Sequence, residues 1–192
     1  MKYQYKHQIM QSLFKPTKSI WIPIIVMGLL AILFFSLNDK KQAPEITFTT
    51  IEGKKITMSS LKGQVVLVNF WATDCPGCIA EMPKLVATYQ QYHSKGLEII
   101  AVAMPTDPIS QVRNYVQKNQ LPFPVVHDDN ADITSHFDDV RLTPTTFMID
   151  PQGRLMGKII GEMDFTALHK TLDKTLENQP DKSLATNTKE AH

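Results

Sequence analysis

Cys75 and Cys78 are the only cysteines in the 192-residue chain, and only Pro76 and Gly77 separate them. A C-x-x-C pair can be a structural disulfide, half of a zinc site, a haem attachment site or a redox-active dithiol. A disulfide across two residues closes too small a loop to remove much chain entropy. Zinc needs two further ligands, but the six His form no closely spaced pair, and haem attachment needs a His where Ile79 stands. The spacing therefore favours a redox-active dithiol.

The two cysteines fall where a predicted strand gives way to a predicted helix. Residues 65–72, "VVLVNFWA", are an almost continuous apolar run, typical of a strand buried on both faces. Residues 76–93 place apolar side chains at three- and four-residue spacings, which predicts a helix that begins near Pro76. Because the free N–H groups at a helix start stabilise a thiolate, Cys75 is the expected nucleophile. Cys78, one turn later, is placed to close the disulfide.

The pattern along residues 44–178 predicts strands and helices in alternation. Asp107 and Asp164 are the expected N-caps of two of the helices. The expected elements, in chain order, are a hairpin turning at Gly53 (46–58), a strand (65–72), a helix (76–93), a strand (97–104), a helix (107–120), a strand (123–128), a short helix (130–138), a second hairpin (145–161) and a helix (164–178). This order predicts an α/β fold, a three-layer α/β/α sandwich with a mixed sheet.

The N-terminal region carries an excess of positive charge and one long apolar run. Residues 1–41 hold six Lys and one Asp, whereas the rest of the chain holds 14 basic and 18 acidic side chains. The slight acidic excess of residues 42–192 argues against nucleic-acid binding. Residues 20–37 are uncharged and as a helix would cover about 27 Å, close to the ~30 Å hydrocarbon core of a bilayer. The run therefore favours one transmembrane signal-anchor over a cleaved signal peptide or a buried core helix.

The lysines that precede this run predict the orientation of the chain. Four Lys and the amino terminus come before residue 20, which by the positive-inside rule puts the N-terminus in the cytoplasm and the folded part outside it. The chain then has five expected parts: a cytoplasmic segment (1–19), the transmembrane anchor (20–37), a linker (38–43), a folded domain (44–178) and a polar, disordered tail (179–192).

Three stretches of the folded part carry a family resemblance: "APEITFTTIEGKKITMSSLKG", "VVLVNFWATDCPGCIAEMPKL" and "LTPTTFMIDPQGRL". They resemble the membrane-anchored, thioredoxin-like TlpA/ResA family over residues 43–178. The resemblance implies a thioredoxin-like fold and thiol–disulfide exchange outside the cytoplasm at the bacterial inner membrane. In that family the exchange is often reductive and serves cytochrome c maturation or disulfides of secreted proteins. It also implies a membrane reductant of the DsbD/CcdA type and no cofactor beyond the dithiol.

The resemblance assigns roles to three residues of the second stretch. Cys75 is the attacking thiol, Cys78 the resolving thiol, and Glu81 the acid that exchanges a proton with Cys78. Ordinary thioredoxins have an Asp where Asn69 stands, and because Asn cannot carry that proton, Glu81 is the expected proton partner. The plainer alternative for Glu81 is a solvated carboxylate on the helix surface.

The resemblance also implies the residues that contact a substrate. Pro144 matches the family's cis-proline, which turns the Thr143 backbone towards the dithiol so that it can pair with an extended peptide. Trp71, Pro76 and Gly77 complete the expected substrate surface. A trans-proline at a strand start and a tryptophan that serves only the core are the alternatives for Pro144 and Trp71.

Two positions depart from the family's usual motif, with Asp74 in place of an aromatic residue and Gly77 in place of proline. A negative charge beside Cys75 opposes ionisation of its thiol, and a less stable thiolate makes the dithiol more reducing. Ile79 replaces a basic residue and makes the rim of the site more apolar.

Other functions for the same residues stay open at the level of sequence. The dithiol could work as a disulfide oxidase or isomerase. A protein of another class, a Cu(I) chaperone, would add His127 or His136 to the two thiols, although the related copper proteins space their cysteines by three residues. No metal ligand set is otherwise expected.

Overall fold

The structure, a computed structural model, describes residues 23–30 and 41–177. Residues 23–30, which fall within the predicted anchor, are helical. The other residues of that anchor, the cytoplasmic segment, the first half of the linker and the tail lie outside the described residues. Within the described ranges, no helix combines the length and the apolar character needed to cross a membrane. Residues 1–40 and 41–192 form two separate units, and the second contains the folded domain.

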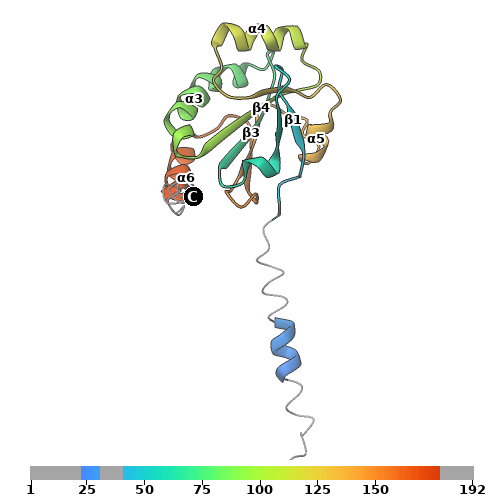
Figure 1. Cartoon of the computed structure of the whole chain (residues 1–192), viewed down its shortest axis with the longest axis vertical. Coiled ribbons are helices and arrows are strands. Elements are labelled where there is room, and N and C mark those ends of the chain that lie inside the picture. The colour runs from blue at the N-terminus through green and yellow to red at the C-terminus, as the bar shows by residue number, and fades with distance from the viewer. Residues whose placement is uncertain (1–22, 31–40, 178–192) are drawn as a thin grey trace, which may run out of the picture. The chain divides into compact units, whose positions relative to one another are not determined.

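The folded domain is built around a five-stranded sheet with the strand order β5-β4-β3-β6-β7. β3 pairs in parallel with β4, and β4 with β5, whereas β6 and β7 are antiparallel to their neighbours. The mixed sheet predicted from the sequence is therefore confirmed (Figure 1). The strands are β3 (Val65–Trp71), β4 (Leu97–Ala103), β5 (Val125–His127), β6 (Thr145–Ile149) and β7 (Leu155–Ile160).

Different elements cover the two faces of this sheet (Figure 1). Three helices pack on one face, namely α3 (Pro76–Tyr92), α4 (Ile109–Asn119) and α6 (Phe165–Glu177), and the short η2 (His93–Lys95) follows α3. The other face is covered by the hairpin of β1 (Thr47–Thr49) and β2 (Lys55–Thr57), by η1 (Met58–Leu61) and by α5 (Asp132–His136). The sandwich thus has three layers, but a hairpin supplies much of the second outer layer.

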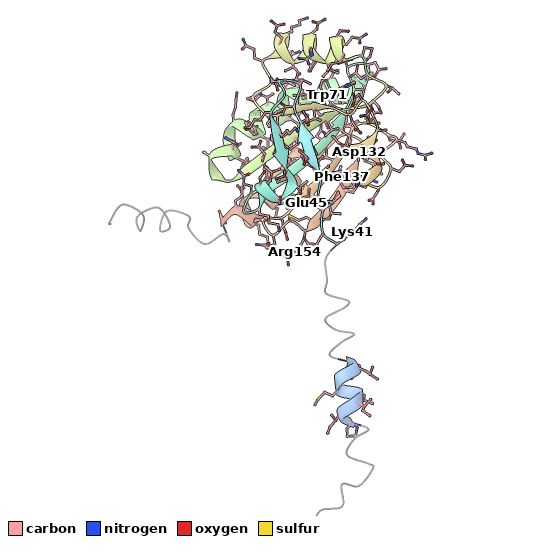
Figure 2. The ribbon with its side chains drawn as sticks, turned by 45° about the vertical axis from the view of Figure 1, so that its right-hand side comes forward. Lys41, Glu45, Trp71, Asp132, Phe137 and Arg154 are labelled. Atoms are coloured by element: carbon pink, nitrogen blue, oxygen red, sulfur yellow. A yellow bond between two sulfur atoms is a disulfide. The ribbon has the colours of Figure 1, made fainter. Side chains whose placement is uncertain are left out.

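β3 is the central strand, and its sequence explains its place. All seven of its residues are buried, because successive side chains enter the cores on opposite faces of the sheet. Leu67 and Trp71 belong to the core under the three helices, whereas Val68 and Phe70 belong to the core under the hairpin. Figure 2 labels Trp71 and Phe137, which lie in these two separate cores.

The first residues of the domain lie beside the start of β7, the strand at one edge of the sheet. The N–H of Leu155 donates to the carbonyl of Lys41 at 2.8 Å, and Gln42 bridges to Arg154. Figure 2 shows Lys41 and Arg154 close together at this end of the domain. The first residues of the domain are therefore fixed to its last hairpin.

The predicted N-cap role of Asp107 is wrong. α4 begins at Ile109 after Pro108, and no side chain caps it. The Asp107 carboxylate turns instead to the loop after β3, where it accepts two hydrogen bonds from Thr73. The other predicted cap is confirmed, since Asp164 accepts from the N–H groups of Thr166 and Ala167 at the start of α6.

Candidate active site

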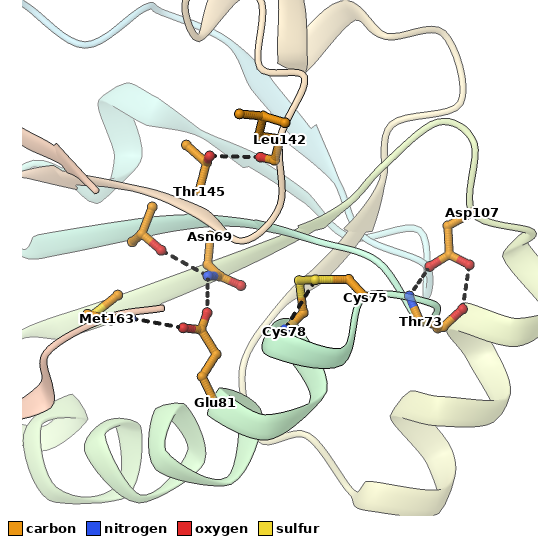
Figure 3. Close-up of a disulfide and its surroundings, with 10 residues drawn as sticks. Asn69, Thr73, Cys75, Cys78, Glu81, Asp107, Leu142, Thr145 and Met163 are labelled. Atoms are coloured by element: carbon orange, nitrogen blue, oxygen red, sulfur yellow. Dashed lines mark hydrogen bonds between the residues drawn. A yellow bond between two sulfur atoms is a disulfide. The ribbon is translucent and has the colours of Figure 1, made fainter. Parts of the chain in front are cut away.

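Cys75 and Cys78 lie where β3 ends and α3 begins, and they form a disulfide with Cα atoms 5.3 Å apart (Figure 3). Cys75 is the N-cap residue of α3, and its sulfur accepts from the N–H of Cys78 at 3.2 Å. Pro76 occupies the first helical position, where the missing N–H costs no hydrogen bond. A sulfur at this place faces the positive end of the helix dipole, which stabilises a thiolate.

The two sulfurs differ in their exposure to solvent. Cys75 is half-buried, whereas Cys78 is 0% exposed and belongs to the core under the helices. A bulky partner can therefore reach only Cys75 directly. This is the division between an attacking and a resolving thiol that the sequence predicts.

Glu81 is buried one helical turn beyond Cys78, with 3% of its surface exposed. Its carboxylate accepts from Asn69 Nδ2 at 3.1 Å and from the N–H of Met163 at 3.3 Å (Figure 3). Burial penalises the charged form and raises the pKa of Glu81 above its usual value, although these two hydrogen bonds oppose the rise. Glu81 is thus no solvated surface carboxylate, and its raised pKa suits proton exchange with a thiol.

Asn69 is the polar residue of the central strand and is 0% exposed. Besides Glu81, its Nδ2 donates to Thr146 Oγ1 on β6 at 2.9 Å. Its Oδ1 has no hydrogen-bond partner. Since an amide neither gains nor loses a proton here, Asn69 can hold the carboxylate of Glu81 in place but cannot exchange a proton itself.

The peptide bond between Thr143 and Pro144 is cis, as the family resemblance implies. Pro144 faces the turn between the cysteines, because a methyl group on Gly77 would lie 3.6 Å from Pro144 Cδ. Two hydrogen bonds hold the loop: Thr145 Oγ1 donates to the carbonyl of Leu142, and the N–H of Gly161 donates to the carbonyl of Pro144, both at 2.8 Å. Figure 3 shows the first of them beside the dithiol.

Trp71 ends β3 beneath the turn and is 0% exposed. Its ring packs on Tyr115 of α4 with the centroids 5.2 Å apart, and its Nε1 has no hydrogen-bond partner. Packing in the core is therefore observed, and the contact with a substrate stays a prediction. Pro76 is exposed and Gly77 half-buried, so both are placed where a bound chain could touch them.

Sequence reasoning missed Asp107 as a residue of the site. Its carboxylate accepts from the N–H of Thr73 at 2.7 Å and from Thr73 Oγ1 at 2.6 Å (Figure 3). Asp107 is 4% exposed, and its backbone carbonyl lies 2.8 Å from His127 Nε2. Thr73 stands two residues before Cys75, so this contact anchors the loop that carries the Cys75 sulfur. No sequence signal points to it.

Sequence reasoning also missed the segment between β7 and α6. Its Met163 supplies a backbone donor to Glu81, and the carboxylate of Glu162 lies against Gly77 in the turn between the cysteines. A backbone N–H has no side-chain signature, and the two residues are far from the cysteines in the sequence. Only the closed fold brings them to the dithiol.

The histidines considered for copper are occupied elsewhere. His127 contacts the Asp107 carbonyl, and His136 Nδ1 lies 2.7 Å from the Asp132 carbonyl on α5. Across residues 23–30 and 41–177, no three His, Cys, Asp or Glu side chains gather as a metal site would require.

Comparison with known proteins gives a consistent picture. The Redoxin family model matches residues 38–176. The chain is 40% identical to the thiol-disulfide oxidoreductase ResA of Bacillus cereus (strain ZK / E33L) over 145 residues, which are 73% of this chain and 83% of the relative. It is 34% identical to ResA of Bacillus subtilis (strain 168) over 134 residues, 70% of this chain and 74% of the relative.

Solved structures are similar over the same region. A thiol:disulfide interchange protein of the thioredoxin family from Chlorobium tepidum TLS superposes with a TM-score of 0.66 and 27% identity, covering 72% of this chain and 97% of that one. StoA from Bacillus subtilis superposes with a TM-score of 0.58 and 25% identity, covering 67% of this chain and 96% of that one.

Proposed function

Because the chain belongs to the Redoxin family and, within it, to the ResA-like thiol–disulfide oxidoreductases, we propose that it reduces disulfides of extracytoplasmic proteins through Cys75 and Cys78. One observation carries the proposal: a single reachable sulfur, that of Cys75, stands at a helix start, with Cys78 and the carboxyl of Glu81 buried behind it. Its reductive direction agrees with Asp74 next to the nucleophile, since that charge disfavours the thiolate.

The exchange proceeds in two steps. In the reduced protein the thiolate of Cys75 attacks one sulfur of a substrate disulfide, and the second substrate sulfur leaves as a thiolate. The thiol of Cys78 then gives its proton to Glu81, directly or through one water molecule, and attacks the sulfur of Cys75. The remaining substrate sulfur leaves, so the substrate gains two electrons and the Cys75–Cys78 disulfide forms.

The substrate chain lies across the cis-proline loop in this proposal. Extended backbone at Thr143 offers hydrogen bonds to a peptide strand, while Pro144, Pro76 and Gly77 form its floor. Leu142, which is 64% exposed beside this loop, supports an apolar contact with the substrate. The buried Trp71 supports the floor from below.

The proposal includes a location and a source of electrons. Residues 20–37 anchor the protein once in the inner membrane, with residues 1–19 in the cytoplasm and the domain outside it. A membrane reductant of the DsbD/CcdA type returns electrons to the Cys75–Cys78 disulfide. Substrates are disulfide-containing extracytoplasmic proteins, those of cytochrome c maturation among them, and nucleic acid is no partner.

Trapping with Cys78→Ala tests the reductase. The variant should accumulate mixed disulfides with extracytoplasmic proteins, visible as shifted bands that a thiol reductant removes. The double variant Cys75→Ala/Cys78→Ala is the matched control and should form none. Absence of mixed disulfides together with failure of the wild-type protein to reduce insulin would sink the proposal. A Cys75–Cys78 pair found oxidised in growing cells, combined with oxidation of reduced substrates, would identify an oxidase instead.

Alkaline phosphatase fusions test the location. A fusion at residue 45 should be active, because the reporter works only outside the cytoplasm. Inactivity there and at the C-terminus would overturn the proposed topology and leave the exchange chemistry untouched.

A further inference from the structure

Gly77 and Glu162 occupy one small space beside the dithiol. A methyl group on Gly77 would lie 3.3 Å from Glu162 Oε1 and 3.5 Å from Glu162 Cγ. The carboxylate of Glu162 therefore rests against the turn between the cysteines, at a place that the missing side chain leaves open. Glu162 is itself exposed, so the charge reaches this place from the solvent side.

The start of α3 explains why a carboxylate lies there. The first N–H groups of a helix form its positive end, and they attract any nearby anion. The N–H of Cys78 already points at the sulfur of Cys75. Two anions, the Glu162 carboxylate and the Cys75 thiolate, therefore compete for the same positive end of the helix and repel each other.

The segments packed around the turn bring further charges. Their ionisable side chains are those of Asp74, Glu81, Lys84, Asp107, Arg141 and Glu162. The two cations do not balance the carboxylates: Arg141 pairs with Asp139, and Lys84 acts on Glu81, where it lowers the pKa. The carboxylate of Glu162 has the opposite effect and raises the pKa of Glu81, so the charge of Glu162 acts on groups inside the site.

We propose that Glu162 is a positioning residue that sets the reactivity of Cys75: its carboxylate, seated against Gly77, opposes ionisation of the Cys75 thiol and makes the dithiol more reducing. Gly77 takes part in this arrangement, since even a methyl group at that position would crowd the carboxylate of Glu162. The inference rests on the proposed role of Cys75 as the attacking thiol. It does not depend on the membrane location or on the identity of the substrate.

The pH dependence of alkylation measures this effect on the full-length chain in detergent. In a Cys78→Ala background, Cys75 is the only thiol, and its reaction rate with iodoacetamide follows the thiolate fraction. Adding Glu162→Gln should raise the thiolate fraction below the thiol's pKa about 3- to 10-fold at low salt, the size expected for one neighbouring charge near a protein surface. In 0.5 M salt, roughly the range where screening shortens to a few ångströms, the gain should shrink.

Gly77→Ala gives an independent test with the charge retained. Alanine suits a helix better than glycine, so this variant should fold. Its methyl group would meet Glu162 Oε1 at 3.3 Å, so the flexible end of Glu162 must shift by a few tenths of an ångström. The thiolate fraction should rise in the same direction as in Glu162→Gln, but by much less, because the charge stays near the turn. The double variant should gain no more than Glu162→Gln alone, because both changes act on the same contact.

Two control variants separate the outcomes. Glu162→Asp keeps the charge and should behave like the starting chain, whereas Glu177→Gln, at the far end of α6, removes an equal charge and should change nothing. A Glu162→Gln profile that matches Glu177→Gln, or fully additive effects of Glu162→Gln and Gly77→Ala, would overturn the inference. If instead Cys78 reacts in the Cys75→Ala chain and Cys75 does not react in the Cys78→Ala chain, the proposed attacking role of Cys75 is wrong. That outcome rejects the proposed function itself and not only the role of Glu162.

Discussion

The two ends of the dithiol turn lie three residues apart and meet opposite surroundings. Cys75 is half-buried, follows the exposed Asp74, and depends on a loop that Asp107 fastens through Thr73. Cys78 is 0% exposed and stands one turn before the buried Glu81. Surface charge therefore acts on the sulfur of Cys75, and desolvation acts on Glu81, the proposed proton partner of Cys78.

This contrast separates two requirements of thiol–disulfide exchange. The attacking thiol must be reachable by a large partner, and its thiolate fraction is then open to tuning by neighbouring charges that salt can screen. The resolving thiol must lose its proton only after the mixed disulfide forms, and in the proposed mechanism a buried carboxyl of raised pKa accepts that proton away from solvent. The four variants below test each half separately.

The largest expected effect is on accessibility. In the reduced single-cysteine chain Cys75→Ala, the buried Cys78 reacts only when the structure opens locally, an event that costs a few kcal/mol. Its alkylation should be on the order of 1,000-fold slower than that of Cys75 in Cys78→Ala. Mass spectrometry of timed samples measures both rates. Equal alkylation rates of Cys75 and Cys78 would show that the two sulfurs do not differ in accessibility.

The second prediction concerns Glu81. Glu81→Gln keeps the size of the side chain but removes the proton acceptor, so the second step should slow by on the order of 100-fold at neutral pH. A single-turnover experiment that follows release of the mixed disulfide measures this step.

The pH dependence sharpens that prediction. Only the carboxylate form of Glu81 accepts a proton, and its pKa is raised because burial penalises the charge. The rate of the second step in the wild-type protein should therefore rise with pH through a midpoint above the usual glutamate value of ~4.3. Glu81→Gln should lose this rise. A variant that keeps both rate and pH profile would assign the proton to another group.

The third prediction concerns the loop that leads to Cys75. Thr73→Val removes the hydroxyl that donates to the Asp107 carboxylate at 2.6 Å. Loss of a hydrogen bond to a charged, buried acceptor should lower the free energy of unfolding by about 1.5–3 kcal/mol. Urea denaturation measures it, and Thr73→Ser, which keeps the hydroxyl, should lose clearly less. If both variants lose the same stability, the loop depends on the methyl group and not on the hydrogen bond.

The smallest effect belongs to Asp74. Asp74→Asn removes an exposed charge beside Cys75, and solvent screens most of its influence. The thiolate fraction of Cys75 should rise by no more than about 2-fold at 0.1 M salt. The pH profile of alkylation in the Cys78→Ala background measures it. A change larger than that of Glu162→Gln would reverse the order of the two carboxylates.

Local sequence patterns predict most of this fold and the centre of the site. The apolar run of β3 and the helical spacing of α3 put the cysteines at their junction, and the resemblance to the TlpA/ResA motif implies the role of Glu81, three residues after Cys78. The match of Pro144 to a family motif predicts the cis bond, which the structure contains. These features depend on residues close together in the chain or on a motif with a fixed geometry.

Long-range contacts escape the same reasoning. Asp107 before Pro108 has the local pattern of a helix cap, but a loop 34 residues earlier offers its carboxylate two donors instead of one. The N–H of Met163 carries no side-chain signal, and the contact of Glu162 with Gly77 depends on a residue that has no side chain. The predicted anchor at residues 20–37 falls mainly outside the described residues and stays a prediction.

The order of the site residues along the chain has a consequence for the synthesis of the protein. Cys75 and Cys78 leave the ribosome well before Met163, which completes the surroundings of Glu81; at roughly 5–20 residues per second the delay is about 4–18 s. The nascent dithiol is therefore made before the surroundings of Glu81 are complete. Because the chain holds no third cysteine, early oxidation within the chain can give only the native pair, and its biosynthesis needs no disulfide isomerase.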